Sequence, residues 1–181
     1  SDDQLKVIAR IEKAVLEGGQ YAMAMPRGSG KTTLCEIACL WALSIAARKF
    51  VLFIGASVEA AKELLASVKV HIESNEIYAA DFPEICYPIQ EIEGRANLCA
   101  GQLSQGERTH ITYGKNVLVL PTIAGSAASG GILRVAGITG RLRGMSHTRS
   151  DGERVRPDLV IIDDPQTDAS AKSEPMCAQR E

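Results

Sequence analysis

The segment Gly28-Ser29-Gly30-Lys31-Thr32-Thr33 combines the residue types that bind phosphate groups. Glycines let backbone N–H groups turn inward around phosphate oxygens, because no Cβ obstructs the turn. A helix that begins inside such a loop adds the positive end of its dipole. We therefore expect Lys31 to reach the β- and γ-phosphates of a nucleotide, and the Thr32 hydroxyl to ligate Mg²⁺.

The usual phosphate-loop pattern is GxxxxGK[ST], and its first glycine falls at Met25 in this chain. A short GSGKT stretch also occurs as a plain glycine-rich turn. The flanking sequence favours phosphate binding over that alternative. The apolar run 21–25 predicts a buried strand before the loop, and residues 31–47, which contain no Gly or Pro, predict a helix after it.

A second group with catalytic potential is Asp163-Asp164, which follows the apolar run LVII at 159–162. An uninterrupted run of this kind predicts a strand that is buried on both faces. In phosphate-loop hydrolases a carboxylate at this place holds Mg²⁺ and its neighbour polarises the attacking water, so we assign Asp163 to the metal and Asp164 to the water. The alternative is a turn, because Asp-Asp-Pro often terminates a strand. Asp164 is one methylene shorter than the Glu that many such enzymes use, so either the water sits closer to the strand or hydrolysis is slow.

The elements expected around these residues follow each other in the order of an α/β fold. Helical spacing of apolar residues over 5–16 predicts an N-terminal helix that Gly18-Gly19 ends. The β-branched and aromatic run 49–55 predicts a strand, and Ser57 is the expected N-cap of an amphipathic helix over 59–72. Alternating strands and helices are typical of a parallel sheet flanked by helices.

The rest of the chain is expected to be less regular. Residues 75–108 contain prolines and glycines and predict irregular structure. Residues 109–113 and 116–120, separated by a Gly-Lys pair, predict a β-hairpin. We further expect a strand over 133–138 and a helix after Ser170.

Length and charge limit the classes of protein to consider. The chain has 181 residues, enough for one domain with a core. A net charge of −2 argues against a protein whose whole surface clamps nucleic acid. The segment 134–156 nevertheless carries six arginines against Asp151 and Glu153. This segment is either a basic contact surface or a solvated loop.

Cysteine and histidine usage indicates neither disulfides nor a zinc site. The five cysteines form no CxxC pair, and an odd number fits no closed disulfide framework. We expect reduced, mostly buried thiols at Cys35, Cys39, Cys86, Cys99 and Cys177. The N-terminus is acidic and polar, and Arg48 and Lys49 interrupt the apolar stretch 37–54. The expectation is a soluble, intracellular protein without a membrane span.

The two motifs in combination resemble the large terminase subunits of tailed phages and prophages. MPRGSGKTT is followed far downstream by RPDLVIIDDPQTD. Terminases carry a variant phosphate loop with an arginine four residues before the lysine, and Arg27 stands at that place before Lys31; their first glycine is frequently missing, as at Met25. The stretch GITGRLRGMSH is also similar, since family members often have an Arg-Gly pair shortly before the acidic strand. The resemblance covers almost the whole chain, although either main motif alone also occurs in helicases.

The resemblance implies a P-loop NTPase fold of the ASCE or RecA-like type, with a mainly parallel central sheet, flanking helices and a β-hairpin insertion. Residues 1–181 would form a partial ATPase domain that ends soon after the Walker B strand, without the coupling motif and the nuclease domain of terminases. The implied cofactors are ATP and Mg²⁺. The residues implied to surround the nucleotide's phosphates are Arg27, Gly28, Ser29, Gly30, Lys31, Thr32 and Thr33.

Two further roles follow from the resemblance alone. Gln4 corresponds to an upstream glutamine that contacts adenine, and the alternative for it is a solvated helix residue. Arg143 corresponds to an arginine finger that acts on a neighbouring subunit's nucleotide. The alternative for Arg143 is a contact with DNA or solvent, and Arg141 is the nearest rival for the finger role.

The resulting expectation is an ATPase motor domain that drives double-stranded DNA into a capsid. It would work in the host cytoplasm as a homo-oligomeric ring, together with a portal protein and a small terminase subunit. One alternative is a helicase-like, nucleic-acid-dependent ATPase, whose acidic box reads Asp-Glu and so disagrees with Asp164-Pro165. The other is a nucleotide-binding switch or assembly module with little hydrolysis, which the short Asp164 side chain supports. Measured turnover of the full-length protein separates these alternatives.

Overall fold

The computed structural model describes residues 2–26, 28–140, 142 and 144–165. Within this part of the chain, a five-stranded sheet has the order β4-β5-β6-β1-β9. Strand β1 runs parallel to β6 on one side and to β9 on the other, whereas β5 pairs antiparallel with both β6 and β4. The strands are β1 (Phe50–Gly55), β4 (Thr112–Tyr113), β5 (Val117–Val119), β6 (Ile132–Gly137) and β9 (Leu159–Ile162).

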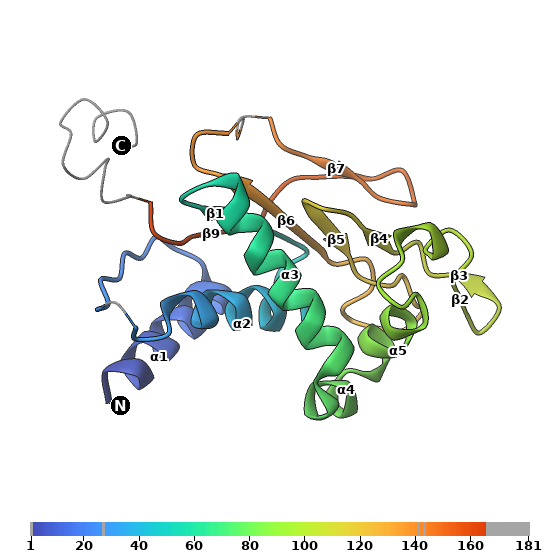
Figure 1. Ribbon diagram of the computed structural model, residues 1–181, viewed down its shortest axis with the longest axis horizontal. Helices are drawn as coiled ribbons and strands as arrows, with labels where there is room; N and C mark the ends of the chain where they lie inside the picture. Colours follow the sequence, from blue (N-terminus) through green and yellow to red (C-terminus); the bar gives the residue numbers. More distant parts are fainter. Residues whose placement is uncertain (1, 27, 141, 143, 166–181) are drawn as a thin grey trace.

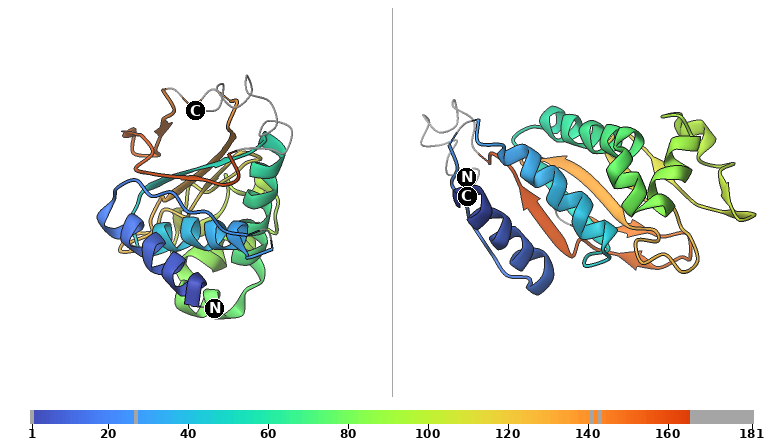
Figure 2. Two further views of the ribbon diagram at one scale, coloured as in Figure 1. Left: turned by 90° about the vertical axis from the view of Figure 1, so that its left-hand side faces the viewer. Right: turned by 90° about the horizontal axis from the view of Figure 1, so that it is seen from below.

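Helices cover one face of this sheet, and a two-stranded arm covers part of the other (Figures 1 and 2). The arm consists of β7 (His147–Thr148) and β8 (Arg154–Val155), and a separate small hairpin consists of β2 (Leu103–Ser104) and β3 (Glu107–Arg108). The helices are α1 (Asp2–Glu17), α2 (Lys31–Ser44), α3 (Val58–Ser74), α4 (Glu76–Asp81), α5 (Pro83–Glu91) and the 3-10 turn η1 (Ala96–Leu98). The part of the chain that the structure describes is thus an α/β arrangement, compatible with a Rossmann-like fold.

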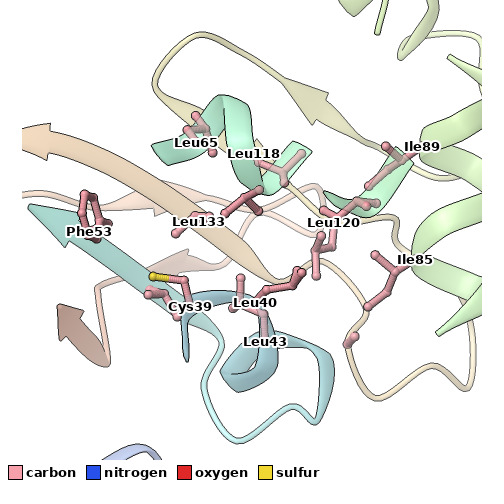
Figure 3. Close-up of a cluster of buried hydrophobic side chains, with 14 of the residues drawn as sticks. Cys39, Leu40, Leu43, Phe53, Leu65, Ile85, Ile89, Leu118, Leu120 and Leu133 are labelled. Atoms are coloured by element: carbon pink, nitrogen blue, oxygen red, sulfur yellow. The ribbon is translucent and has the colours of Figure 1, made fainter. Parts of the chain in front are cut away.

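The main core lies between the sheet and the helices, because alternate residues of a strand point to opposite faces. Val51 and Phe53 of β1 point to the helical face, where they pack with Leu133 of β6 and with side chains of α2, α3 and α5 (Figure 3). On the opposite face, Phe50 and Ile132 form a smaller cluster against Met145 and Val155, together with Val117 and Val119. The arm is therefore attached to the sheet by apolar contacts.

Much of the expected element order is confirmed. Helix α1 ends where Gly18 takes a φ of 79°. Strand β1 matches the run 49–55 within one residue, and the Ser57 hydroxyl caps α3 by accepting a hydrogen bond from the Ala60 amide over 3.1 Å. The hairpin expected over 109–120 forms as β4 and β5. That hairpin extends the main sheet at its edge and is not an insertion, so the sheet is mixed, not mainly parallel.

Three expectations about local structure are wrong. Residues 21–25 form no strand, because Ala22 and Ala24 offer little side-chain surface to a sheet and no neighbouring strand pairs with them. Residues 75–108 contain α4, which the Asn75 side chain caps, and α5, which tolerates Pro83 at its start, where proline costs no hydrogen bond, and holds Pro88 in its interior. Strand β9 is a sheet edge among the described residues and is partly buried on one face only, through Leu159 and Ile161, with Val160 and Ile162 about half exposed.

Two further expectations concern a helix after Ser170 and membrane-spanning segments. The helix expected after Ser170 lies outside the described residues. No described helix combines the length and the apolar character that crossing a membrane requires.

Candidate functional site

The glycine-rich loop and the acidic pair meet at the carboxyl ends of the parallel strands β1 and β9. Because these strands run in the same direction, both end at one edge of the sheet. The Asp163 amide donates to the Ile54 carbonyl over 2.9 Å, which continues the ladder one residue beyond β9. In open α/β sheets, ligands bind at this edge.

The loop before α2 depends on two glycines with left-handed backbone conformations. Gly28 has a φ of 76° and Gly30 a φ of 81°, a region that is strained for residues with a Cβ. Gly30 is also the N-cap of α2, and its carbonyl accepts the first helical hydrogen bond, from Leu34, over 3.0 Å. A Cβ at either glycine would meet no atom within 4 Å, so backbone conformation and not crowding explains both glycines.

Two consecutive residues at the start of α2 contact two consecutive residues after β9. The Lys31 ammonium lies 2.8 Å from a carboxylate oxygen of Asp164. The Thr32 hydroxyl donates to a carboxylate oxygen of Asp163 over 2.7 Å. The residues expected to bind phosphate and metal are thus in direct contact, although 131 to 133 positions separate them in the sequence.

Asp164 occupies an unusual backbone conformation, with a φ of 44°. Aspartate and asparagine enter this left-handed region more readily than most residues, because their short polar side chains form local hydrogen bonds. The turn directs the Asp164 side chain toward α2, where it reaches Lys31. Asp164 therefore takes part in a turn that ends the strand and also presents its carboxylate to the loop. The two roles considered for Asp164 are compatible with each other.

A cavity of about 450 Å³ adjoins these residues and brings in two carboxylates that the sequence analysis missed. Glu36 of α2 and Glu63 of α3 line it together with Thr32, Asp163 and Asp164. Glu36 stands four residues after Thr32, so helical spacing alone could have placed it on the same face. Glu63 had no such signal, because the packing of α3 over β1 brings it to the cavity.

The Cys35 thiol forms a neutral part of the site. Burial, followed by the negative charges of Asp163 and Asp164, raises the pKa of this thiol to about 12. The thiol therefore stays protonated near neutral pH and is a poor metal ligand there. The expectation of reduced cysteines is confirmed for Cys35, Cys39, Cys86 and Cys99, whereas Cys177 lies outside the described residues.

The residues present are compatible with Mg²⁺ held jointly with a phosphate ligand. Among the described residues, no group of three His, Cys, Asp or Glu side chains is placed to hold a metal ion. Mg²⁺ commonly uses only one or two carboxylates and takes its other ligands from phosphate oxygens and water. The adjacent oxygens of Thr32 and Asp163 match this donor set.

Gln4 contacts the loop itself. Its side-chain amide donates to the Ser29 carbonyl over 3.2 Å, and the Ser29 hydroxyl donates to the Pro26 carbonyl over 2.7 Å. This contact links α1 to the loop and gives Gln4 a positioning role that the sequence analysis did not foresee. The adenine contact expected of Gln4 stays a prediction. Thr33 lies on the first turn of α2 and lines a different cavity, on the side of Trp41.

Three arginines named in the sequence analysis lie outside the described residues, namely Arg27, Arg141 and Arg143. Their expected roles stay predictions. Comparison of the chain with protein-family models, with curated proteins and with solved structures found no match in any of the three.

Proposed function

We propose that this chain binds ATP with Mg²⁺ at the loop before α2 and hydrolyses the terminal phosphoanhydride bond. One observation carries the proposal: the pair Lys31-Thr32 contacts the pair Asp163-Asp164. A turn that merely ends a strand does not require a lysine and a threonine at a distant helix start. The same four residues match the division of labour in phosphate-loop hydrolases.

Each of the four side chains has a distinct task in the proposal. Lys31 holds phosphate oxygens by charge-assisted hydrogen bonds. Thr32 and Asp163 supply oxygen ligands for Mg²⁺, which when bound neutralises negative charge on the phosphates. Asp164 orients the attacking water and accepts its proton. Glu36 and Glu63 face the same cavity and add negative charge beside the metal ligands.

The wider role that we propose rests on the resemblance to large terminase subunits. In that role the chain is the ATPase part of a motor that moves double-stranded DNA into a capsid. It would act in a homo-oligomeric ring with a portal protein and a small terminase subunit, and Arg143 would reach a neighbouring subunit's nucleotide. The support for this role is the combination of the two motifs with the Arg-Gly pair at 143–144.

A second candidate function is a nucleotide-binding switch with little hydrolysis. The Lys31–Asp164 ion pair favours it, because a carboxylate engaged by the ammonium is not aligned as a base for water. In this candidate the carboxylate and a phosphate group compete for Lys31, so nucleotide binding would release Asp164. The release would be the signal, and turnover would be slow.

Calorimetry with ATP, ADP and AMP, each with and without Mg²⁺, tests nucleotide binding. We expect affinity to fall in the order ATP, ADP, AMP, and Mg²⁺ to strengthen only the first two substantially. Equal affinity for AMP and ATP would contradict binding through the phosphates. Phosphate release from ATP, measured on the same protein, then separates an ATPase from a switch.

A further inference from the structure

A second cavity, of about 560 Å³, lies away from the acidic pair. It is formed between the arm and the chain that enters β4, and it is separate from the cavity that Asp163 and Asp164 line. Helix α1 contacts the loop before α2 through Gln4, and it lies at one end of the molecule (Figure 1). The β2–β3 hairpin, which contributes Arg108 to the cavity, lies at the other end. A ligand in this cavity would therefore not occupy the candidate nucleotide site.

The lining of this cavity is basic. Among the described residues that line it are Arg108, His110, His147 and Arg149, and none of the lining residues is an aspartate or a glutamate. Burial, and then the nearby Arg134, lowers the pKa of His147, which favours the neutral ring, and a neutral ring offers one N–H donor. The fixed positive charges are thus those of the two arginines. Hydroxyl groups of Thr112, Thr148 and Ser150 also line the cavity, whereas the Tyr113 hydroxyl already donates to the Glu73 carboxylate over 2.6 Å.

Arg149 is held in place by the arm. Its amide donates to the Glu153 carbonyl over 2.8 Å, and a guanidinium nitrogen lies 3.5 Å from the Ser129 carbonyl. Its ion pairs with Asp151 and Glu153 are long, at 3.9 and 3.6 Å, and both carboxylates are more than half exposed. Such pairs contribute little in water, so a ligand anion can compete for this guanidinium.

His110 stands in a strained conformation at the rim. Its φ is 51°, in the left-handed region, and its side chain is exposed. The conformation costs free energy for a residue with a Cβ, whereas glycine would adopt it without strain. An exposed imidazole kept at such a position has no role in the core of the fold. His110 is one of the residues that line the basic cavity.

We propose that this cavity binds a phosphate group, which Arg108 and Arg149 hold while His110 and His147 donate hydrogen bonds. Two arginines line this cavity, and a guanidinium group matches the charge and the geometry of phosphate oxygens. The phosphate belongs either to the backbone of duplex DNA or to a small anion. The site does not depend on the proposed ATP hydrolysis, because it shares no residue with the acidic pair's cavity.

The test uses the full 181-residue chain and two probes. Fluorescence anisotropy measures binding of a labelled DNA duplex over a range of salt concentrations. NMR of the imidazole protons of His110 and His147 measures binding of inorganic phosphate. The variants are Arg108→Gln, His110→Gly, and the control Arg10→Gln on the exposed surface of α1. His110→Gly removes the ring and relieves backbone strain, so it tests the site without threatening the fold.

If the phosphate is that of DNA, Arg108→Gln and His110→Gly each weaken duplex binding at least fivefold, and Arg10→Gln does not. In Arg108→Gln the slope of log affinity against log salt concentration also becomes less steep by about one, as expected for one lost phosphate contact. If the source is a small anion, duplex binding is unchanged, but phosphate shifts the imidazole signals in the parent and not in Arg108→Gln. Unchanged response to both probes in both variants would overturn the proposal.

Discussion

The ammonium of Lys31 and the carboxylate of Asp164 form an ion pair of 2.8 Å that joins the start of α2 to the end of β9. The Asp164 side chain is 62% exposed and that of Lys31 is 26% exposed. An ion pair this accessible to water contributes little to stability. The ion pair matters for the candidate site because it shows that the group that would bind phosphate and the group that would activate water lie within hydrogen-bonding distance of each other.

Replacing Asp164 by asparagine separates binding from hydrolysis. Asparagine also tolerates the left-handed backbone at this position, where φ is 44°, so we expect the fold to persist. ATP·Mg²⁺ should bind as tightly as in the parent or more tightly, because the carboxylate no longer competes for Lys31. Turnover should fall roughly 10²-fold, since the proton acceptor is lost. Intact turnover in a phosphate-release assay would transfer the role to Glu36 or Glu63, which line the same cavity.

Asp163→Asn and Thr32→Val should instead impair the response to Mg²⁺. Thr32→Val removes one of two adjacent oxygens, which lie 2.7 Å apart, and Asp163→Asn removes the negative charge from the group that carries the other. We expect ATP affinity without Mg²⁺ to change little, and the strengthening by Mg²⁺ to shrink about tenfold or more. Asp81→Asn, at an exposed position on α4, is the matched control. Calorimetry at several Mg²⁺ concentrations measures the effect, and a full Mg²⁺ response in Asp163→Asn would contradict the assignment.

The buried thiols predict that stability falls in alkaline solution. The pKa of the Cys35 thiol has its usual value of 9.0 in the unfolded chain and rises to about 12 in the folded protein. Above pH 9 the unfolded state therefore binds fewer protons than the folded state, so the free energy of unfolding decreases as pH rises. This contribution is fully present below pH 9 and is lost progressively above it. Burial also raises the pKa values of Cys39 and Cys86, so the decrease is shared.

Urea unfolding at a series of pH values between about 8 and 10.5 measures this slope. Cys35→Ser is the comparison, because a serine hydroxyl does not ionise in this range. The variant should lose stability less steeply with pH than the parent. Identical slopes would show that Cys35 ionises as readily in the folded protein as in the unfolded chain.

The parts of the fold that local patterns determine could be predicted from the sequence. The helical period ending at Gly18 predicted α1, and the hydroxyl of Ser57 predicted the start of α3. Both depend on residues close in the chain. The burial of β9 could not be predicted in this way, because a run such as LVII does not reveal which faces of the strand have neighbours.

In the candidate site, too, some residues could be identified from sequence motifs, whereas others are brought together only by packing. Lys31, Thr32, Asp163 and Asp164 could be identified because a specific chemistry fixes their types and their order. Glu63 carries no motif, and only the packing of α3 on β1 brings it near the acidic pair. The basic cavity combines residues from β3 and β7 that no spacing rule connects.

The central claim is that the loop before α2 binds a nucleotide through its phosphates, and Lys31→Ala tests it most directly. The matched control is Lys13→Ala, which removes an exposed lysine of α1 whose partner is Glu17. Isothermal titration with ATP·Mg²⁺ should show that Lys31→Ala binds at least about thirtyfold more weakly than the parent, a loss of about 2 kcal/mol, because a charge-assisted contact to phosphate is removed. Lys13→Ala should bind as the parent does. Equal affinity in Lys31→Ala and the parent would contradict the claim.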